Sequence, residues 1–425
     1  MNEKNQNLDT LVVGAGIAGI EASLMLSKAD KKVYLVEKTS YTGGTTIKFE
    51  EVFSNMECST CMLAPRQQEL LQNKNISLLT LSNIEDLRGS RGNFSVRIHK
   101  KARYVDMDNC IGCNACFDPC PISIKNEFEE GLNERKAIYV PCAGALPNVP
   151  MIDTENCIRF KGKECTACQE ACMFEAIDYN QKDEKIELKV GSIIIATGFD
   201  IFDVKKLPKY GYGKIDDVYT SMEFERMYAS NGPTEGKIVL KNGKTPNSVA
   251  LIHCVGRNEK GYCSAVCCMY SLKFNHYLKS KIPDVKISEF YTDFCIPGKT
   301  HQKFYEKIKK TNVNMIRTKE VEVTKQDKKI IIDYNDGGKK NSLSVDMVIL
   351  APAIVPNSSS SKLAKILDIS LDEYGFFNED KTNDSSVISS KSGIFIVGCA
   401  QGAKNIQDSV SQASAAVGKI LLSPA

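Results

Sequence analysis

The chain has 425 residues, which is too long for one hydrophobic core and predicts two or three domains. Its 55 Lys and Arg residues nearly balance its 52 Asp and Glu residues, so the net charge of +3 argues against a nucleic-acid-binding surface. The N-terminus, Met1 to Asp9, is polar without a signal-peptide apolar region, and no apolar run approaches the roughly 20 residues of a membrane span. The 17 cysteines therefore indicate metal ligands in a reducing cytoplasm.

The N-terminal segment carries a dinucleotide-binding motif. An apolar strand, Leu8 to Val13, leads into Gly14-x-Gly16-x-x-Gly19 and a helical pattern, and a second strand ends at Glu37. Such glycines let the backbone approach a pyrophosphate at a helix N-terminus, and the acid can accept hydrogen bonds from a ribose. Gly43-Gly44 follows the acid closely, and a glycine pair there is typical of flavoproteins with two dinucleotide-binding folds. We therefore expect FAD rather than NAD in this first fold.

The most specific pattern is a pair of cysteine runs. The first is Cys110-x2-Cys113-x2-Cys116-x3-Cys120-Pro121, the run that binds a cubane iron–sulfur cluster in bacterial ferredoxins. The second is Cys157-x7-Cys165-x2-Cys168-x3-Cys172, with a long first gap and no Pro after its last Cys. Because the fourth Cys of each run binds the other cluster, two sets of ligands are expected. They are Cys110, Cys113, Cys116 and Cys172 for one [4Fe-4S] cluster, and Cys157, Cys165, Cys168 and Cys120 for the other. Zinc is the alternative, disfavoured because eight thiolates follow ferredoxin order.

This ferredoxin-like stretch interrupts the flavin domain. Phe94 to Ile98 and Ile186 to Val190 each alternate apolar and polar residues, as half-buried strands do. In flavoprotein disulfide reductases such a meander runs directly into an Ala-Thr-Gly strand, here Ala196-Thr197-Gly198, that returns to the FAD sheet. We therefore expect residues 104–180 to be an inserted domain close to the flavin.

A second nucleotide-binding fold should begin near Ser248, after a short strand at Lys237 to Leu240. Its strand ends at His253, but the expected glycine loop is replaced by a segment with one glycine, Gly256, and four cysteines. This argues against NAD(P)H binding and for a third cluster. Its expected ligands are Cys254, Cys263, Cys267 and Cys268, with unreactive buried cysteines as the alternative.

The sequence leaves the roles of two further sites undecided, one near Cys58 and one near the C-terminus. Cys58-x-x-Cys61 is compatible with a redox disulfide beside the flavin, with two metal ligands, or with two packing cysteines. Near the C-terminus, the strand Gly393 to Gly398 ends at Cys399, where flavoproteins of this type usually have an Asp against the FAD. Lys404 follows and could stabilise an anionic reduced flavin, or be a plain surface residue. We name Cys399 and Lys404 as candidate catalytic residues.

The sequence predicts an α/β protein with two Rossmann-like nucleotide-binding domains of the thioredoxin-reductase type and an inserted α+β two-cluster ferredoxin domain. The expected parts are 1–103 and 351–425 for the FAD domain, 104–180 for the insertion, 181–245 for the return strand and connection, and 246–350 for the second Rossmann-like domain. The expected FAD-binding residues are Gly14, Gly16, Ile17, Ala18, Gly19, Glu37, Lys38, Gly43, Gly44, Ala196, Thr197, Gly198, Gly398, Cys399, Ala400 and Gln401.

Taken together, the motifs resemble those of the family of heterodisulfide reductase A subunits. The most specific pieces are Cys58 to Pro65, Asn126 to Phe128 with Arg135 to Tyr139, Pro147 to Val149, His253 to Arg257, and Gly398 to Gly402. The resemblance implies FAD, an inserted two-cluster ferredoxin domain and a further cluster near the flavin. It also implies oxidoreductase activity with flavin-based electron bifurcation.

The implied partners are B- and C-like subunits, a hydrogenase or formate dehydrogenase donor, and ferredoxin, around a homodimer in a larger complex. The chain is expected to lack the family's N-terminal and C-terminal cluster domains. A relay subunit without bifurcation is the alternative function, and an NAD(P)H-dependent disulfide reductase is a weaker one.

Overall fold

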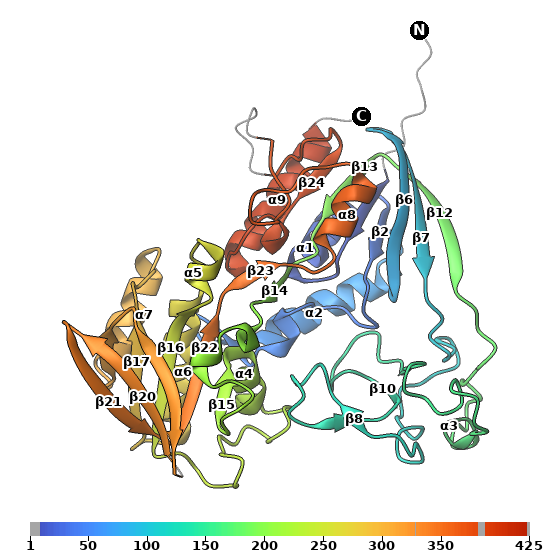
Figure 1. The fold of residues 1–425 in the computed structure, drawn as a ribbon. Coiled ribbons are helices and arrows are strands. Elements are labelled where there is room, and N and C mark those ends of the chain that lie inside the picture. The colour runs from blue at the N-terminus through green and yellow to red at the C-terminus, as the bar shows by residue number, and fades with distance from the viewer. Residues whose placement is uncertain (1–8, 328, 381–386, 423–425) are drawn as a thin grey trace.

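The computed structural model describes residues 9–327, 329–380 and 387–422 (Figure 1). Two parallel sheets form the centres of two α/β domains, and a third, mostly irregular segment lies beside them (Figure 1). In this part of the chain, no helix is long and apolar enough to cross a membrane.

The first domain is built on a five-stranded parallel sheet in the order β24-β13-β1-β2-β5. Its strands are β1 (Thr10–Val13), β2 (Val33–Val36), β5 (Ile76–Leu79), β13 (Ser192–Ile195) and β24 (Ile394–Ile396). All four residues of β1 and of β13 are buried, as expected of a parallel sheet that is covered on both faces. The helices α1 (Ile17–Lys28), α2 (Ser59–Gln72) and α9 (Ile406–Leu422) pack on one face through a shared apolar core.

An antiparallel meander covers the other face of this sheet. It consists of β6 (Ser82–Ser90), β7 (Asn93–Lys100) and β12 (Glu184–Val190) in the order β12-β7-β6, and α8 (Ser360–Leu367) packs beside it. β7 and β12 pair in register from Lys100 with Glu184 to Phe94 with Val190. Residues 101–183 therefore leave and re-enter the domain between two paired strands.

The segment 101–183 has little regular structure. It contains the two-residue strands β8 (Ile124–Lys125), β9 (Glu134–Arg135), β10 (Ile138–Tyr139) and β11 (Met151–Ile152), and the short helix α3 (Ala167–Glu170). Its apolar core is small and includes Val105, Ala137, Ile138 and Ile152 together with several cysteines of the two runs. Such a core gives the segment little stability of its own without bound groups or neighbouring domains.

The second domain has another five-stranded parallel sheet, in the order β15-β22-β16-β17-β18. Its strands are β15 (Val218–Thr220), β16 (Ser248–Val255), β17 (Lys286–Tyr291), β18 (Asn314–Arg317) and β22 (Met347–Pro352). The helices α4 (Ser221–Tyr228), α5 (Arg257–Lys260), α6 (Cys267–Lys281) and α7 (Lys299–Lys309) accompany it, and β19 (Val321–Gln326), β20 (Lys329–Asp336) and β21 (Lys339–Val345) form an antiparallel meander. The expected strand at Lys237 to Leu240 is wrong, because these residues have no regular structure and lead into a turn in which Gly243 N–H donates to Leu240 O at 2.8 Å.

Two short ribbons join the domains. β14 (Phe199–Ile201) pairs antiparallel with β23 (Ile354–Pro356), so the chain enters and leaves the second domain along one ribbon. A second ribbon, β3 (Glu51–Val52) with β4 (Glu57–Cys58), precedes α2 and reaches toward α6 through Glu51, whose N–H donates to Tyr277 Oη at 3.0 Å. The region between the sheets is therefore closed by backbone from both domains.

Candidate functional site

A cavity of about 410 Å³ lies at the carboxyl ends of β1, β2, β13 and β24, where parallel sheets place their ligand sites. Twelve of the predicted FAD residues line it: Gly14, Gly16, Ile17, Ala18, Glu37, Lys38, Gly44, Ala196, Thr197, Gly198, Gly398 and Cys399. Thr45, Thr46 and Asn357 also line it and were not predicted. Thr45 and Asn357 come from irregular segments and Thr46 begins the short 3-10 helix η1 (Thr46–Lys48), and none of these carries a periodic signal in the sequence.

Four predicted residues, Gly19, Gly43, Ala400 and Gln401, do not line the cavity. A Cβ atom on Gly19 would lie 1.8 Å from Gly14 O, so this glycine is needed for the close packing of α1 on the turn. A Cβ atom on Gly43, whose φ is +107°, would lie 2.8 Å from Leu63. Both glycines therefore allow close packing of the segments behind the residues that line the cavity.

The glycine turn itself fits a pyrophosphate. A Cβ atom on Gly14 would meet Ala196 O at 2.4 Å, so the turn presses against β13. A Cβ atom on Gly16 would meet nothing closer than Gly44 Cα at 3.9 Å, because Gly16 faces open space at the N-terminus of α1. Backbone N–H groups at this helix end are free to meet an anion.

The acid and one orphaned hydroxyl also fit a dinucleotide. Glu37 is buried, and its carboxylate accepts from Ala15 N–H at 2.7 Å, Thr39 N–H at 2.8 Å and Thr39 Oγ1 at 2.9 Å. These bonds fix the carboxylate at the end of β2 and leave it acceptor capacity for a ribose. Among the described residues, the buried Thr197 Oγ1 has no hydrogen-bond partner, and Thr197 lines the cavity. A buried polar atom without a partner is costly unless a ligand satisfies it.

A second cavity, of about 600 Å³, continues from the first toward the second domain. The two share the lining residues Ile17, Thr45, Thr46, Phe199, Cys399 and Ser409. The first turns of α9 and parts of α6 also line the second cavity. Together the cavities form one elongated site between the sheets.

Cys399 and Lys404 both line the second cavity. The Cys399 thiol donates to Lys404 O at 3.3 Å, and burial raises its pKa. The Lys404 ammonium donates to Gly398 O at 2.9 Å, Gly402 O at 3.0 Å and Gln401 Oε1 at 3.3 Å, and burial lowers its pKa. Three acceptors match its three donors, so here this lysine holds the loop before α9.

A second buried lysine, Lys273 on α6, lines the same cavity and was missed by the sequence analysis. Its Nζ donates to Glu225 Oε2 at 2.6 Å and to Glu51 O at 2.9 Å, and burial lowers its pKa while Glu225 opposes that effect. Burial raises the pKa of Glu51, whose Oε2 has no partner among the described residues. The sequence does contain a signal for this position. Lys273 lies four residues after Met269 and four before Tyr277, so it shares a helix face with two buried residues.

The cysteines of the insertion fall into two neighbourhoods. Cys120, Cys157, Cys165 and Cys168 line one small cavity together, which is the second predicted ligand set. Burial raises the pKa of Cys110 and, to about 12, that of Cys116, and Cys172 adds to both effects. Cys113 contributes to the effect at Cys110. Cys110, Cys113, Cys116 and Cys172 are the members of the first predicted set, and Cys168 of the second set also raises the pKa of Cys116, so the two neighbourhoods adjoin.

Both clusters nevertheless stay a prediction. Within the described ranges, no three Cys, His, Asp or Glu side chains are arranged as a metal site. The chemistry of the donor set fits cubane clusters, because four thiols from the two runs line one small cavity and the remaining ligands expected are thiols as well.

The third cysteine group surrounds the carboxyl end of β16 and the start of α6. Interaction with the Cys267 thiol lowers the pKa of both Cys254 and Cys268, while the pKa of Cys267 itself is raised. Cys295, which the sequence analysis did not include, donates its N–H to Cys268 Sγ at 3.4 Å and interacts with Cys263. Cys295 follows β17, the parallel neighbour of β16, and this adjacency was the missing signal.

Comparisons with known proteins agree with this geometry. Residues 9–49 match the FAD binding domain family. The chain is 38% identical over 418 residues to the A subunit of the H(2):CoB-CoM heterodisulfide,ferredoxin reductase of Methanothermobacter thermautotrophicus, covering 96% of this chain and 63% of the relative. It is 41% identical over 420 residues to an iron-sulfur A subunit of the CoB--CoM heterodisulfide reductase of Methanopyrus kandleri, covering 96% and 62%.

Solved structures of lower identity show the fold. The thioredoxin reductase of Lactococcus lactis matches with a TM-score of 0.54 at 14% identity, covering 97% of this chain and 98% of that one. The thioredoxin reductase of T. acidophilum matches with a TM-score of 0.52 at 13% identity, covering 97% of each. The predicted fold of two Rossmann-like domains is confirmed, and the ferredoxin fold of the insertion stays a prediction. The chain spans slightly less than two thirds of the length of the two methanogen relatives, and it belongs to the family of heterodisulfide reductase A subunits.

Proposed function

We propose that the chain is an electron-transfer subunit of a heterodisulfide-reductase-like complex, with FAD and [4Fe-4S] clusters as its redox groups. The observation that carries the proposal is the combination, in one chain, of a cavity lined by the dinucleotide motif and a small cavity lined by Cys120, Cys157, Cys165 and Cys168, which come from both cysteine runs. When bound, FAD supplies the conversion between paired and single electrons, which iron–sulfur clusters carry one at a time.

The chain's own residues have distinct roles in this proposal. Glu37 and the turn at Gly16 hold the adenosine diphosphate part, since they line the first cavity. Cys399, Lys404 and Lys273 line the second cavity, where the flavin ring would lie. Buried cations there favour an anionic ring, and the apolar wall from Phe199, Val266 and Phe274 excludes water.

We propose that the second Rossmann-like domain no longer binds NAD(P)H and so does not take electrons from it. β16 ends in a segment where Gly256, with φ of +84°, packs against Phe202, and Arg257 Nη1 lies 3.9 Å from Cys254 Sγ. Thiols occupy the place where other members of the fold bind a pyrophosphate, and Cys254, Cys263, Cys267 and Cys268 are the proposed ligands of a third cluster. Electrons are therefore expected from a protein partner rather than from NADH.

The finer proposals concern the complex. B- and C-like subunits, a hydrogenase or formate dehydrogenase donor, and ferredoxin are the proposed partners, and bifurcation at the flavin is the proposed mode. The name of the Methanothermobacter relative contains both a heterodisulfide and a ferredoxin, which supports ferredoxin as one of the proposed partners.

Anaerobic purification followed by cofactor analysis tests the proposal. We expect one FAD and roughly twelve iron atoms per chain if three cubane clusters form. FMN alone, or zinc in place of iron, would contradict it. Mixing with NADH should leave the flavin band unchanged, whereas bleaching within seconds that persists after Cys254→Ala would restore a disulfide-reductase function.

A further inference from the structure

The Cys58–Cys61 disulfide is a feature that the proposed function does not use. It is the disulfide of this structure, and the other fifteen cysteines are free thiols. It closes a loop with a sequence separation of only 3, and crosslinks of such short loops contribute little to stability. In reducing compartments, where thiols predominate, the few disulfides that form are usually catalytic or redox-sensing. A structural role therefore explains this bond poorly.

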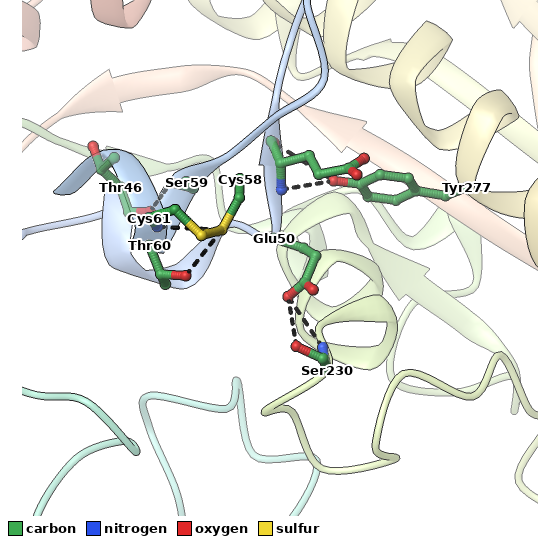
Figure 2. The surroundings of a disulfide bond; sticks show 9 residues. Thr46, Glu50, Cys58, Ser59, Thr60, Cys61, Ser230 and Tyr277 are labelled. Atoms are coloured by element: carbon green, nitrogen blue, oxygen red, sulfur yellow. Dashed lines mark hydrogen bonds between the residues drawn. A yellow bond between two sulfur atoms is a disulfide. The ribbon is translucent and has the colours of Figure 1, made fainter. Parts of the chain in front are cut away.

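The two sulfur atoms have different surroundings (Figure 2). Cys61 is exposed, whereas Cys58 is half-buried and is the N-cap residue of α2. Cys58 Sγ accepts from Cys61 N–H at 3.2 Å and lies 3.4 Å from Thr60 Oγ1. An N–H, a hydroxyl and the N-terminus of a 14-residue helix all stabilise negative charge on the Cys58 sulfur.

The disulfide lies beside the flavin-side cavity, not in it. Neither cysteine lines the first or the second cavity as the described residues form them, but Glu57 and Met62 on either side line the second one. Ser59 Oγ donates to Thr46 O at 2.7 Å, and Thr46 lines both cavities (Figure 2). Cys61 is itself an exposed residue, so another molecule can reach it from outside the cavity.

We propose that Cys58–Cys61 is a redox-active site that exchanges with an external dithiol. One thiolate of the dithiol attacks the exposed Cys61 sulfur, the Cys58–Cys61 bond breaks, and Cys58 leaves as the stabilised thiolate. The second thiol of the dithiol then attacks the mixed disulfide and releases Cys61. The external dithiol is oxidised to a disulfide, and the two cysteines take up its two electrons and two protons. The inference does not depend on the flavin, because the exchange takes place between sulfur atoms.

Redox titration of the full, anaerobically purified chain tests this. The protein is equilibrated in buffers of reduced and oxidised dithiothreitol, quenched in acid, and alkylated for peptide mass spectrometry. Cys58 and Cys61 should convert together and reversibly between disulfide and dithiol, whereas the buried Cys142 stays a free thiol as the matched control. A pair that remains in one state across the whole range overturns the proposal.

Variants identify the roles of the two sulfurs. Thr60→Val removes the hydroxyl at constant shape and should slow reduction by dithiothreitol several-fold, and an unchanged rate overturns Cys58 as the leaving group. Cys58→Ser incubated with glutathione disulfide should form a mixed disulfide on the peptide that contains Cys61, and the same peptide of the Cys58→Ser, Cys61→Ser double variant should carry none. Thr60→Val and Cys58→Ser should each keep the iron content of the parent protein. A loss of about four iron atoms would instead indicate that Cys58 and Cys61 are ligands of an iron–sulfur cluster.

Discussion

Arg226 on α4 contacts the insertion and the FAD domain from the second domain. Its removal therefore tests how much this contact contributes to the stability of the chain. Its guanidinium donates to both oxygens of Glu129 at 2.7 and 2.9 Å and to Lys48 O at 2.9 Å, and it lies 5.0 Å from the ring centre of Phe128. The side chains of Arg226 and Glu129 are 1% and 5% exposed. Water therefore cannot replace the lost partner when either one is removed.

Arg226→Ala leaves the Glu129 carboxylate buried and unpaired, which costs about 3–5 kcal/mol of unfolding free energy. The matched control is Arg97→Ala, whose ion pair with Glu187 at 2.9 Å is 38% and 60% exposed. That surface pair is worth about 0.2–1 kcal/mol. The Arg226→Met, Glu129→Leu double variant should recover most of the loss, because it removes both charges together.

Anaerobic urea unfolding followed by circular dichroism measures these differences. Limited proteolysis adds a local readout, since residues 101–183 should be cut sooner in Arg226→Ala than in Arg97→Ala. If Arg226→Ala costs no more than Arg97→Ala, or if the double variant is as unstable as the single one, the buried ion pair does not hold the insertion to the other domains.

Three further predictions concern the cofactors. Gly16→Leu should abolish FAD binding without unfolding the chain, because a side chain at position 16 would extend into the open space of the cavity. The control variant Gly418→Ala should retain FAD. The flavin absorbance that remains after desalting measures FAD binding in both variants. Cys168→Ser should lower the iron content by about four atoms and Cys142→Ser should not, by colorimetric iron assay. Lys273→Met should lower the reduction potential of the flavin in an anaerobic potential titration, because it removes a buried cation from the second cavity. An unchanged potential would show that Lys273 has no electrostatic effect on the flavin.

The sequence determined the features that depend on local spacing. The glycine turn at Gly14 and Gly16, the acid at Glu37 and the Ala-Thr-Gly strand end were found because a tight turn beside a helix N-terminus tolerates few residue types. The two meander strands β7 and β12 could be recognised because they keep the alternation of half-buried strands, and the prediction of an inserted domain rests on the segment between them. The order of the cysteines predicts a swap of ligands between two clusters, since cluster geometry fixes ligand spacing, and this swap stays a prediction.

Only the tertiary structure decided which distant residues meet. Lys273 contacts Glu225 and Glu51 across the domain boundary, and Cys295 reaches Cys268 from the neighbouring strand. Neither pairing has a sequence spacing that could predict it, because both depend on how the parallel strands and the two domains are arranged. The same holds for Cys58 and Cys61: their spacing left three roles open, and the exposure of one sulfur beside a capped helix favours redox exchange. Local spacing limits what a motif can be, whereas burial and neighbours, which arise from packing, determine its chemistry.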